Sequence, residues 1–481
     1  MTGCPRGDAP LRPSSVMPQT FKDSLLQRPM CLYGRSIFPA VAWFVIVAVA
    51  GLTPTQSTFG QEAAEVTIKL GDPVVVARAP ADLDRAAHGW GRWQFPKLSR
   101  LADGRLLVTF SLEPDSYASS GKPVGCAYSS DDGETWQAGE PQPRSVLEQG
   151  TRLPNGDRLK PVELPPAAAT NDELPAPECN FVCSYGYPRS LYRADKLPAE
   201  LRGWRFRRLV AGSSQWIEES AEVDIPDELV HVTAENQRGA TPGVGASQAV
   251  TDGPLSRPYL WGRLHVAHDQ SLWGVTYLWR LHSGNPHYGP VFLRSTDHGH
   301  AWRMAGEIRY RADIGKDPHA ERRDGLTEPD YSFRPDGSLI CLMRTMDGNG
   351  HGPLLLTRSG DRGRSWSDPV RFATFGKTPQ LLTLDGGVTL ATYGASGGPG
   401  FFVVRATTDP AGMHWGPPLK VPLRPPSGNA WDTCGHTELA ALGPHAALMV
   451  YSDFNVPDNS DRLRKTILVR TIHISPGRDP R

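Results

Sequence analysis

The sequence has no excess of charge of either sign. Its 51 lysines and arginines are matched by 51 aspartates and glutamates among 481 residues. Proteins that bind nucleic acid or membrane surfaces through electrostatics usually carry a basic excess or a basic stripe. The composition therefore gives no reason to expect a nucleic-acid partner, nor a membrane-surface partner.

Cysteine is scarce. The chain has seven cysteines, and those that follow residue 60 are odd in number: Cys126, Cys179, Cys183, Cys341 and Cys434. One disulfide is possible in an oxidising compartment, but no disulfide framework is implied. Because Cys179 and Cys183 lack a second pair at metal-ligand spacing, we predict no zinc site, no other metal and no cofactor.

Long hydrophobic runs are also missing, with one exception at residues 37–52, IFPAVAWFVIVAVAGL. This run is short for a bilayer span, which needs about 20 residues, and Pro39 interrupts it. Arg28 and Arg35 precede the run. Basic residues before a short apolar run are typical of a secretory signal peptide.

Small residues after the run favour cleavage near Gly60. We therefore predict that residues 1–60 are a signal peptide with an N-terminal extension and that the mature protein is secreted or periplasmic. Met30 is an alternative start to Met1, and it would give a signal of ordinary length. A membrane association is expected only if the N-terminal segment stays uncleaved.

Glycine and proline, by contrast, are abundant, with 49 and 45 residues. Both break helices, and their abundance suits many short strands joined by turns. A chain of 481 residues is too long for one ordinary domain unless it is a repeat architecture. The composition thus favours a repetitive all-β protein.

One octet, S-x-D-x-G-x-x-W, occurs three times. Its Ser and Asp are expected to accept hydrogen bonds from the turn's own backbone, its Gly to supply a positive φ, and its Trp to pack back between strands. A fourth copy contains one inserted residue. The copies lie at residues 129–136, 295–302, 359–366 and 407–415.

A second repeat lies upstream of the octets and consists of two apolar strands around an Asp-Gly turn, at residues 103–104, 336–337 and 385–386. Two hairpins per unit give four strands, which is the make-up of a propeller blade. We count six units in residues 61–481, with the strand near 66–76 completing the last one. Residues 211–255 have weak patterning, which predicts a loop insertion.

The octets resemble the Asp-box of the sialidase (neuraminidase) superfamily. The resemblance implies an all-β fold, a six-bladed β-propeller of four-stranded antiparallel blades. Asp-boxes lie on the outside of the propeller, do no chemistry and also occur in propellers without enzyme activity. They therefore indicate the fold more strongly than the function.

Polar and ionisable residues stand at equivalent places in the units, where each innermost strand begins. These places are Gln94, Glu328, Lys377 and His436, or their direct neighbours. Innermost strands line a propeller's central channel, so these side chains should converge at its mouth, the default position for a site.

The resemblance to sialidases is more specific here. Glu328 and Arg344 resemble the family's glutamate, which activates a tyrosine nucleophile, and one of its three substrate-binding arginines. However, His436 stands where the tyrosine would be, and Gln94 stands where the first arginine would be. Asp115 can be matched with the family's acid. A lone arginine cannot reproduce the bidentate pairing of a sialic acid carboxylate, so the substrate is expected to differ.

We therefore expect a secreted enzyme that cleaves a glycan, the glycan having an anionic sugar. Glu328 would be the base or acid, and His436 its proton-transfer partner, with Asp115 as a further acid. Arg344 would clamp the anionic group. Further candidate substrate-binding residues are Gln94, Lys377 and Glu438.

Two other functions stay open, a non-catalytic propeller that binds glycan or protein and a lyase acting on uronate-containing polysaccharide. Each candidate residue also has a purely structural interpretation. Glu328 and Arg344 can form a structural ion pair, His436 can be a satisfied interior histidine, and Asp115 can be a solvated loop residue.

Overall fold

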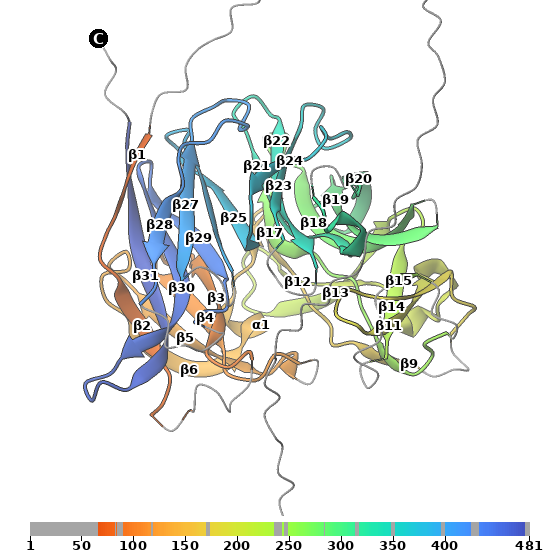
Figure 1. Cartoon of the computed structure of the whole chain (residues 1–481), viewed down its shortest axis with the longest axis horizontal. Helices are drawn as coiled ribbons and strands as arrows, with labels where there is room; N and C mark the ends of the chain where they lie inside the picture. The colour runs from red at the N-terminus through yellow and green to blue at the C-terminus, as the bar shows by residue number, and fades with distance from the viewer. Residues whose placement is uncertain are drawn as a thin grey trace, which may run out of the picture. The chain divides into compact units, whose positions relative to one another are not determined.

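The structure, a computed structural model, is almost entirely β (Figure 1). It describes residues 66–476 except 82, 84–89, 117–118, 170–173, 235–242, 245–248, 283, 313–316, 348–351, 396–399 and 425–431. All of these belong to the compact unit Gln61–Arg481. The one α-helix among them is α1 (Arg144–Leu147), a single turn, and none is long and apolar enough to cross a membrane. The predicted signal peptide lies outside the described residues.

Most strands form antiparallel runs of four, which we call repeats, each strand pairing with the next. Repeat 1 is β3 (Gln94–Arg100), β4 (Leu106–Ser111), β5 (Pro123–Ser129) and β6 (Gln137–Pro143). Repeat 2 is β7 (Thr151–Arg152), β8 (Arg158–Pro161), β12 (Trp204–Leu209) and β13 (Trp216–Asp224). Repeat 3 is β17 (Trp261–Val266), β18 (Leu272–His282), β19 (Asn285–Ser295) and β20 (Ala301–Glu307).

The remaining repeats have the same order. Repeat 4 is β21 (Gly325–Phe333), β22 (Leu339–Met346), β23 (Leu354–Ser359) and β24 (Val370–Ala373). Repeat 5 is β25 (Lys377–Thr383), β26 (Thr389–Gly394), β27 (Phe401–Thr407) and β28 (Leu419–Pro422). Repeat 6 is β29 (Thr437–Gly443), β30 (Ala446–Pro457), β31 (Leu463–Pro476) and the two N-terminal strands β1 (Val66–Leu70) and β2 (Val74–Arg78).

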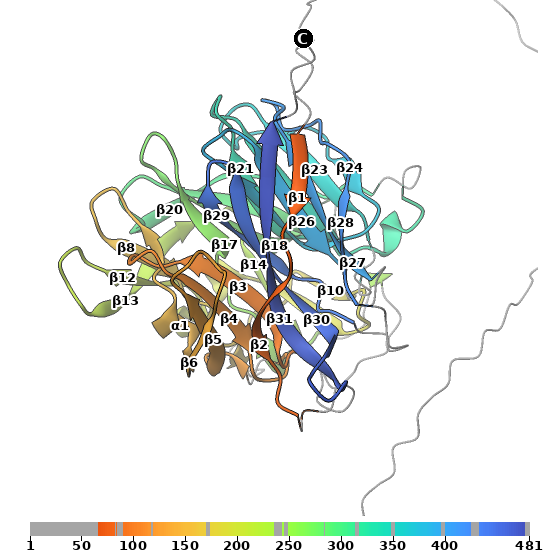
Figure 2. The ribbon, with the colours of Figure 1, turned by 90° about the vertical axis from the view of Figure 1, so that its left-hand side faces the viewer.

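The predicted division into six separate four-stranded sheets is not confirmed. The sheets have four, four, five, six and twelve strands. Repeats 2, 3 and 4 merge into the twelve-stranded sheet through two short parallel contacts, one between β13 and β20 and one residue pair between β19 and β21. The pairing of β1 and β2 with β31 was expected from the sequence and is confirmed (Figure 2).

The six-stranded sheet is separate from the repeats and is built from segments that flank β12 and β13; we call it the inserted sheet. Its strands are β9 (Ala167–Ala169), β10 (Cys179–Val182), β11 (Pro188–Arg193), β14 (Leu229–Thr233), β15 (Gly243–Val244) and β16 (Gly253–Leu255). The segment 211–255, predicted as a loop insertion, thus contributes strands to this sheet and to repeat 2. These strands are short and pair with distant partners, as β16 does with β9, so they leave little periodic signal.

Three innermost strands share a kink at a residue that precedes proline. Phe95, Glu328 and Thr378 have φ of 54°, 48° and 40°. In each case the pairing with the next strand changes register at this point. Proline has no N–H to donate, so the ladder is interrupted there, and the residue before it adopts a left-handed conformation found rarely outside turns and functional sites. In repeat 6, Gly435 has φ of 79° just before His436.

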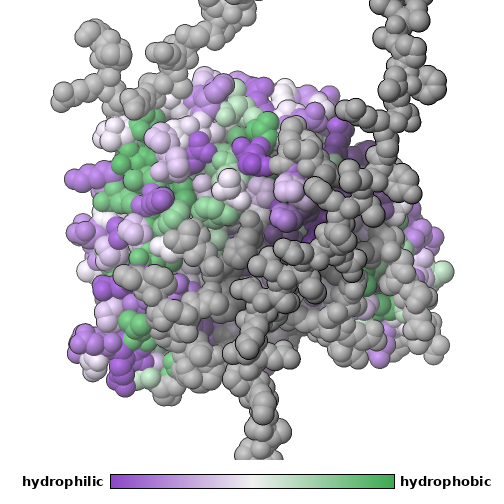
Figure 3. All heavy atoms as spheres, viewed as in Figure 1, coloured by the Kyte–Doolittle hydropathy of each residue, from purple (hydrophilic) through white to green (hydrophobic). Residues whose placement is uncertain are grey.

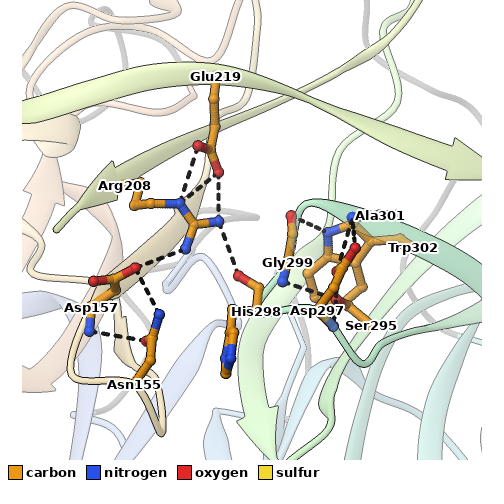
Figure 4. Close-up of polar contacts among 10 residues, drawn as sticks. All are labelled: Asn155, Asp157, Arg208, Glu219, Ser295, Asp297, His298, Gly299, Ala301 and Trp302. Atoms are coloured by element: carbon orange, nitrogen blue, oxygen red, sulfur yellow. Dashed lines mark hydrogen bonds and ion pairs between the residues drawn. The ribbon is translucent and has the colours of Figure 1, made fainter.

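The octet turns have the predicted hydrogen bonds (Figure 4). In repeat 3, Ser295 Oγ accepts from Gly299 N at 2.8 Å, Asp297 Oδ1 accepts from Ala301 N at 3.0 Å, and Trp302 Nε1 donates to Gly299 O at 3.0 Å. The copies at 129–136 and 359–366 have the same bonds. Of the four octet tryptophans, only Trp302 is fully buried.

The turns fasten each repeat to the one before it. The guanidinium of Arg208 on β12 pairs with Asp157 and Glu219 of repeat 2 and donates to His298 O in the octet turn of repeat 3 at 2.9 Å (Figure 4). Each octet glycine, in addition, lies against a side chain from the second strand of the preceding repeat. The pairs are Gly133 with Leu448, Gly299 with Leu159, Gly363 with Trp273, and Gly412 with Ile340.

Apolar clusters follow the same order. One of them joins Val108 and Phe110 of repeat 1 to Leu448 and Val469 of repeat 6, so that the first repeat packs against the last. The exposed apolar side chains are scattered along the chain, and the face in Figure 3 intersperses hydrophilic and hydrophobic residues. The core therefore lies between successive repeats.

Candidate functional site

Glu328 and Arg344 form an ion pair at the start of repeat 4. Arg344 Nη1 donates to Glu328 Oε1 at 2.7 Å, and Thr378 donates to Glu328 Oε2 from its backbone N at 2.8 Å. The kink before Pro329 aims the Glu328 side chain at both partners. Glu328 is thereby held in one position by donors from two repeats.

The Glu328–Arg344 ion pair is more buried than side chains that have to contact a substrate. Glu328 is 9% exposed and the Arg344 side chain 3%. A catalytic carboxylate at a channel mouth would face solvent, and the burial of Glu328 contradicts that expectation. Burial alone would raise the pKa of Glu328, but the positive charge of Arg344, aided by His436 and Lys377, outweighs it and lowers the pKa to about 2. Glu328 is a carboxylate at any physiological pH.

His436 lies near this pair and is half-buried. Its ring packs against Phe95 of repeat 1, with centroids 4.7 Å apart. Burial lowers the pKa of His436 to about 3, since the neighbouring charge of Glu328 only partly opposes it. His436 is therefore neutral at pH 7 and can accept a proton but not donate one from an imidazolium.

Asp115 belongs to the same neighbourhood and is exposed. Its backbone N donates to Trp90 O at 2.8 Å, and the Lys377 Nζ lies 5.4 Å from the centre of the Trp90 ring. Desolvation raises the pKa of Asp115, against the effects of Trp90 and Lys377. Desolvation and the charge of Arg344 lower the pKa of Lys377. Glu328, Arg344, His436 and Lys377 thus act on one another electrostatically, and Lys377 also acts on Asp115.

The other two predicted residues lie elsewhere. The Gln94 side chain is fully buried, and its Oε1 accepts no hydrogen bond. Glu438 lies two residues further along the strand than His436, where it accepts from Arg263 at 2.6 Å and pairs with Lys97 at 3.5 Å. These two cations occupy the Glu438 carboxylate, so a substrate would have to displace them.

Two acids that the sequence reasoning missed lie close by. Asp330, two residues after Glu328, is buried, and desolvation raises its pKa to about 7. Glu163 is exposed, and desolvation raises its pKa, with Asp115 acting in the same direction and Lys97 opposing. The register shift between Thr327 and Asp330 breaks the alternation that could have placed Asp330 beside Glu328. Glu163 follows β8 in an irregular segment that carries no periodic signal.

Neither a disulfide nor a metal site is found in the part of the chain that the structure describes. Its five cysteines are free thiols, and no three His, Cys, Asp or Glu side chains in the described ranges cluster as metal ligands would.

Comparisons with known proteins give the fold only. No family model matches the chain, and no curated protein matches it significantly. Among solved structures, a protein of unknown function from Dyadobacter fermentans is similar with a TM-score of 0.51 and 15% identity, over 85% of this chain and 99% of that chain.

Two enzymes match more distantly. They are a sialidase of Streptococcus pneumoniae (TM-score 0.42, 14% identity, 83% of this chain and 70% of that chain) and an α-L-arabinanase of Penicillium chrysogenum (TM-score 0.40, 14% identity, 83% and 98%). At these scores neither carries an argument about activity.

Proposed function

We propose that the protein is a glycoside hydrolase with a sialidase-like β-propeller fold, acting on a glycan that contains an anionic sugar. The observation that carries this proposal concerns two carboxyl groups on which the charge of Lys377 acts. The pKa of Asp115 is raised, and the pKa of Glu328 is lowered to about 2. Carboxyl groups whose pKa values are shifted in opposite directions suit the separate acid and charge-stabilising roles of glycoside cleavage.

The roles follow from protonation and exposure. Asp115 is exposed and retains its proton to higher pH, so it donates to the leaving oxygen. Glu328 is ionised and stabilises the positive charge that develops on the sugar. His436, neutral at pH 7, accepts a hydrogen bond from the attacking water or hydroxyl and orients it, and the proton released in the attack passes to solvent. Arg344 is buried against Glu328, so its role is to hold that carboxylate in place rather than to clamp the substrate.

The accessible cations support an anionic substrate. Lys377 is half-buried between Asp115 and Glu328, and the Lys97 side chain is 40% exposed. An anionic sugar group would meet Lys377 in the position that we first assigned to Arg344. An ammonium group binds as a point charge and sets less geometry than a guanidinium fork, which favours a substrate other than sialic acid.

We infer that the repeats close into a six-bladed propeller. Gly133 of repeat 1 lies against Leu448 of repeat 6, as each other octet glycine lies against the repeat before it. The pairing of β1 with β31 supplies the outer strand of the last blade from the other end of the chain. Both contacts support a closed ring.

A non-catalytic glycan-binding propeller is the second candidate, and the burial of the Glu328–Arg344 pair favours it. A buried pair with several hydrogen bonds can serve the fold alone. The two candidates differ in what they require of Asp115, which is exposed and contributes little to stability.

The test is to compare the wild-type protein with Asp115→Asn on a panel of anionic and neutral polysaccharides and aryl glycosides. Because Asp115 is exposed, the variant should unfold at the wild-type midpoint and lose hydrolysis by two orders of magnitude or more, which is roughly the contribution of a general acid. Asp132→Asn, which changes an exposed aspartate in an octet turn, is the matched control and should retain activity. Binding without hydrolysis by the wild type would establish the second candidate instead.

A further inference from the structure

A row of aromatic side chains lies next to the candidate site and has no part in the roles assigned so far. It runs through Tyr259, Trp261, Tyr277 and Tyr288, all from repeat 3 or the segment just before it. Successive ring centroids are 6.4, 5.3 and 5.6 Å apart. Each ring therefore contacts the next, and the four rings form one continuous cluster.

These rings differ from the core aromatics of the same repeat. Trp273, Trp279 and Phe292 are at most 2% exposed, whereas every member of the row is half-buried. Aromatic rings that keep one face or edge accessible beside polar groups are typical of binding surfaces. A row of four exceeds the single exposed apolar residues that need no explanation.

The row is adjacent to the candidate catalytic residues. Burial raises the pKa of Tyr277, and the charges of Glu328 and Glu163 act in the same direction. The same two carboxylates act on Tyr259. The phenols of the row therefore lie within electrostatic reach of the carboxylate that the proposed reaction uses.

The inserted sheet adds a fifth ring to the row. Tyr185 lies in the turn between β10 and β11, half-buried, where the charges of Arg344 and Glu328 affect its pKa. The turn is held in place by Asp324 of repeat 4, which accepts from Ser184 N at 2.9 Å and from Ser184 Oγ at 2.7 Å. Tyr185 and Tyr288 pack against the same apolar cluster.

Two cations lie beside the row. Lys97 Nζ lies 5.8 Å from the centre of the Trp261 ring, and Arg189 of the inserted sheet donates to the Tyr288 hydroxyl at 3.2 Å. An acidic group on a chain lying along the row would meet positive charge beside Trp261 and beside Tyr288.

We propose that Tyr259, Trp261, Tyr277, Tyr288 and Tyr185 form a subsite on which several sugar rings of an anionic glycan chain stack, so that the substrate is an oligosaccharide or polysaccharide rather than one terminal sugar. This inference rests on the proposed function, whose site it extends. The aromatic faces contact the C–H faces of the sugars, and Lys97 and Arg189 lie near acidic groups of the chain.

The test measures binding separately from turnover. Isothermal titration of the Asp115→Asn protein with galacturonate oligomers of two, three, four and six residues should give affinities that rise with length at least to four. Neutral arabino-oligosaccharides of the same lengths are the second series and should bind more weakly at each length. Adding Trp261→Ala should weaken tetramer binding roughly tenfold, the size expected for one lost aromatic contact, and change dimer binding less than twofold.

Two further variants keep the result interpretable. Trp261→Phe retains a ring and should keep most of the affinity, which also shows that the position tolerates change. Trp216→Ala removes another half-buried tryptophan, on the outer strand of repeat 2, and should leave binding unchanged. All variants are checked for an unchanged unfolding midpoint.

Affinities that do not depend on length in either series, or equal effects of Trp261→Ala and Trp216→Ala, would overturn the subsite. A length dependence confined to the neutral series would overturn its anionic specificity. Length-dependent binding by a wild-type protein that hydrolyses nothing would refute the proposed function and leave the subsite standing. Hydrolysis by the wild type without any length dependence of binding would support the proposed function and refute the subsite.

Discussion

Gly133, in the first octet turn, lies against Leu448 in the second strand of the last repeat. A Cβ placed on Gly133 would be 2.8 Å from Leu448 Cδ2, closer than such atoms come in proteins. The contact joins residues that are more than 300 positions apart. It is repeated, with other partners, at each of the remaining octet glycines.

Gly133→Ala should therefore destabilise the protein by about 2–4 kcal/mol, the sum of a left-handed backbone cost and of overpacking. Gly104 is the matched control, since its φ of 88° is also positive but a Cβ there meets nothing within 4 Å. Gly104→Ala should cost only about 1–2 kcal/mol. Denaturant unfolding of both variants measures the difference, and equal losses would show that the contact with Leu448 is not tight.

Glu328→Gln should lower the free energy of unfolding by roughly 3–5 kcal/mol, because it leaves the Arg344 charge buried without its partner. Glu328→Gln combined with Arg344→Met should recover most of this loss, since both charges are then gone. If the double variant folds well and still lacks activity, the pair serves the reaction; a wild-type midpoint for the single variant would contradict the burial argument.

Asp330 should make the protein less stable as pH rises from about 4 to 7. The folded state holds its proton up to a pKa of about 7, while the unfolded chain loses it near 3.8. The folded state thus binds more protons within this window, and raising pH through it costs up to about 1.4 kcal/mol per pH unit. Asp330→Asn should remove this slope, measured as the pH dependence of the difference from wild type, while Asp132→Asn should not.

Sialic acid should be a poor substrate. Only Arg344 corresponds to a substrate-binding arginine of sialidases, and it is buried against Glu328. Release of methylumbelliferone from its α-sialoside, compared with uronides and arabinosides of the same leaving group, measures this preference. Efficient release from the sialoside would show that another residue binds the carboxylate.

We also propose that the chain is exported and cleaved near Gly60, for the reasons that the composition of residues 1–60 gives. N-terminal sequencing of protein from its native host should begin near Gln61. Recovery of an intact N-terminus in the membrane fraction would indicate an uncleaved anchor, and in the cytosol it would contradict export.

The features that the sequence predicted correctly are mostly local ones. The octet turns could be predicted because each hydrogen bond joins residues within eight positions. The kinks at Phe95, Glu328 and Thr378 were not predicted, although each precedes a proline. The inserted sheet could not be predicted from the sequence. Strands such as β9 and β16 are three residues long, and the residues that they pair are more than 80 positions apart in the chain.

The sequence identified several residues of the candidate site but not their surroundings in the fold. Glu328, Arg344 and His436 follow from the alignment of repeats, and the structure brings them within electrostatic reach of one another. The burial of Arg344 depends on how repeat 4 packs against its neighbours, which no local pattern encodes. Tyr185 and Glu163 reach the site from irregular segments around the inserted sheet, where spacing carries no information.

The pairing of Val66 with Pro476 has a consequence for the order in which the molecule assembles. β1 can pair only after β31 has been synthesised. The first of the described strands to be synthesised is therefore among the last to join a sheet. Contacts of such long range are slow to form because the intervening chain must first be ordered. Synthesis of β31 therefore sets the earliest moment at which the sheet of repeat 6 can be completed. Until then β1 has an unpaired edge that a chaperone or a second chain can bind.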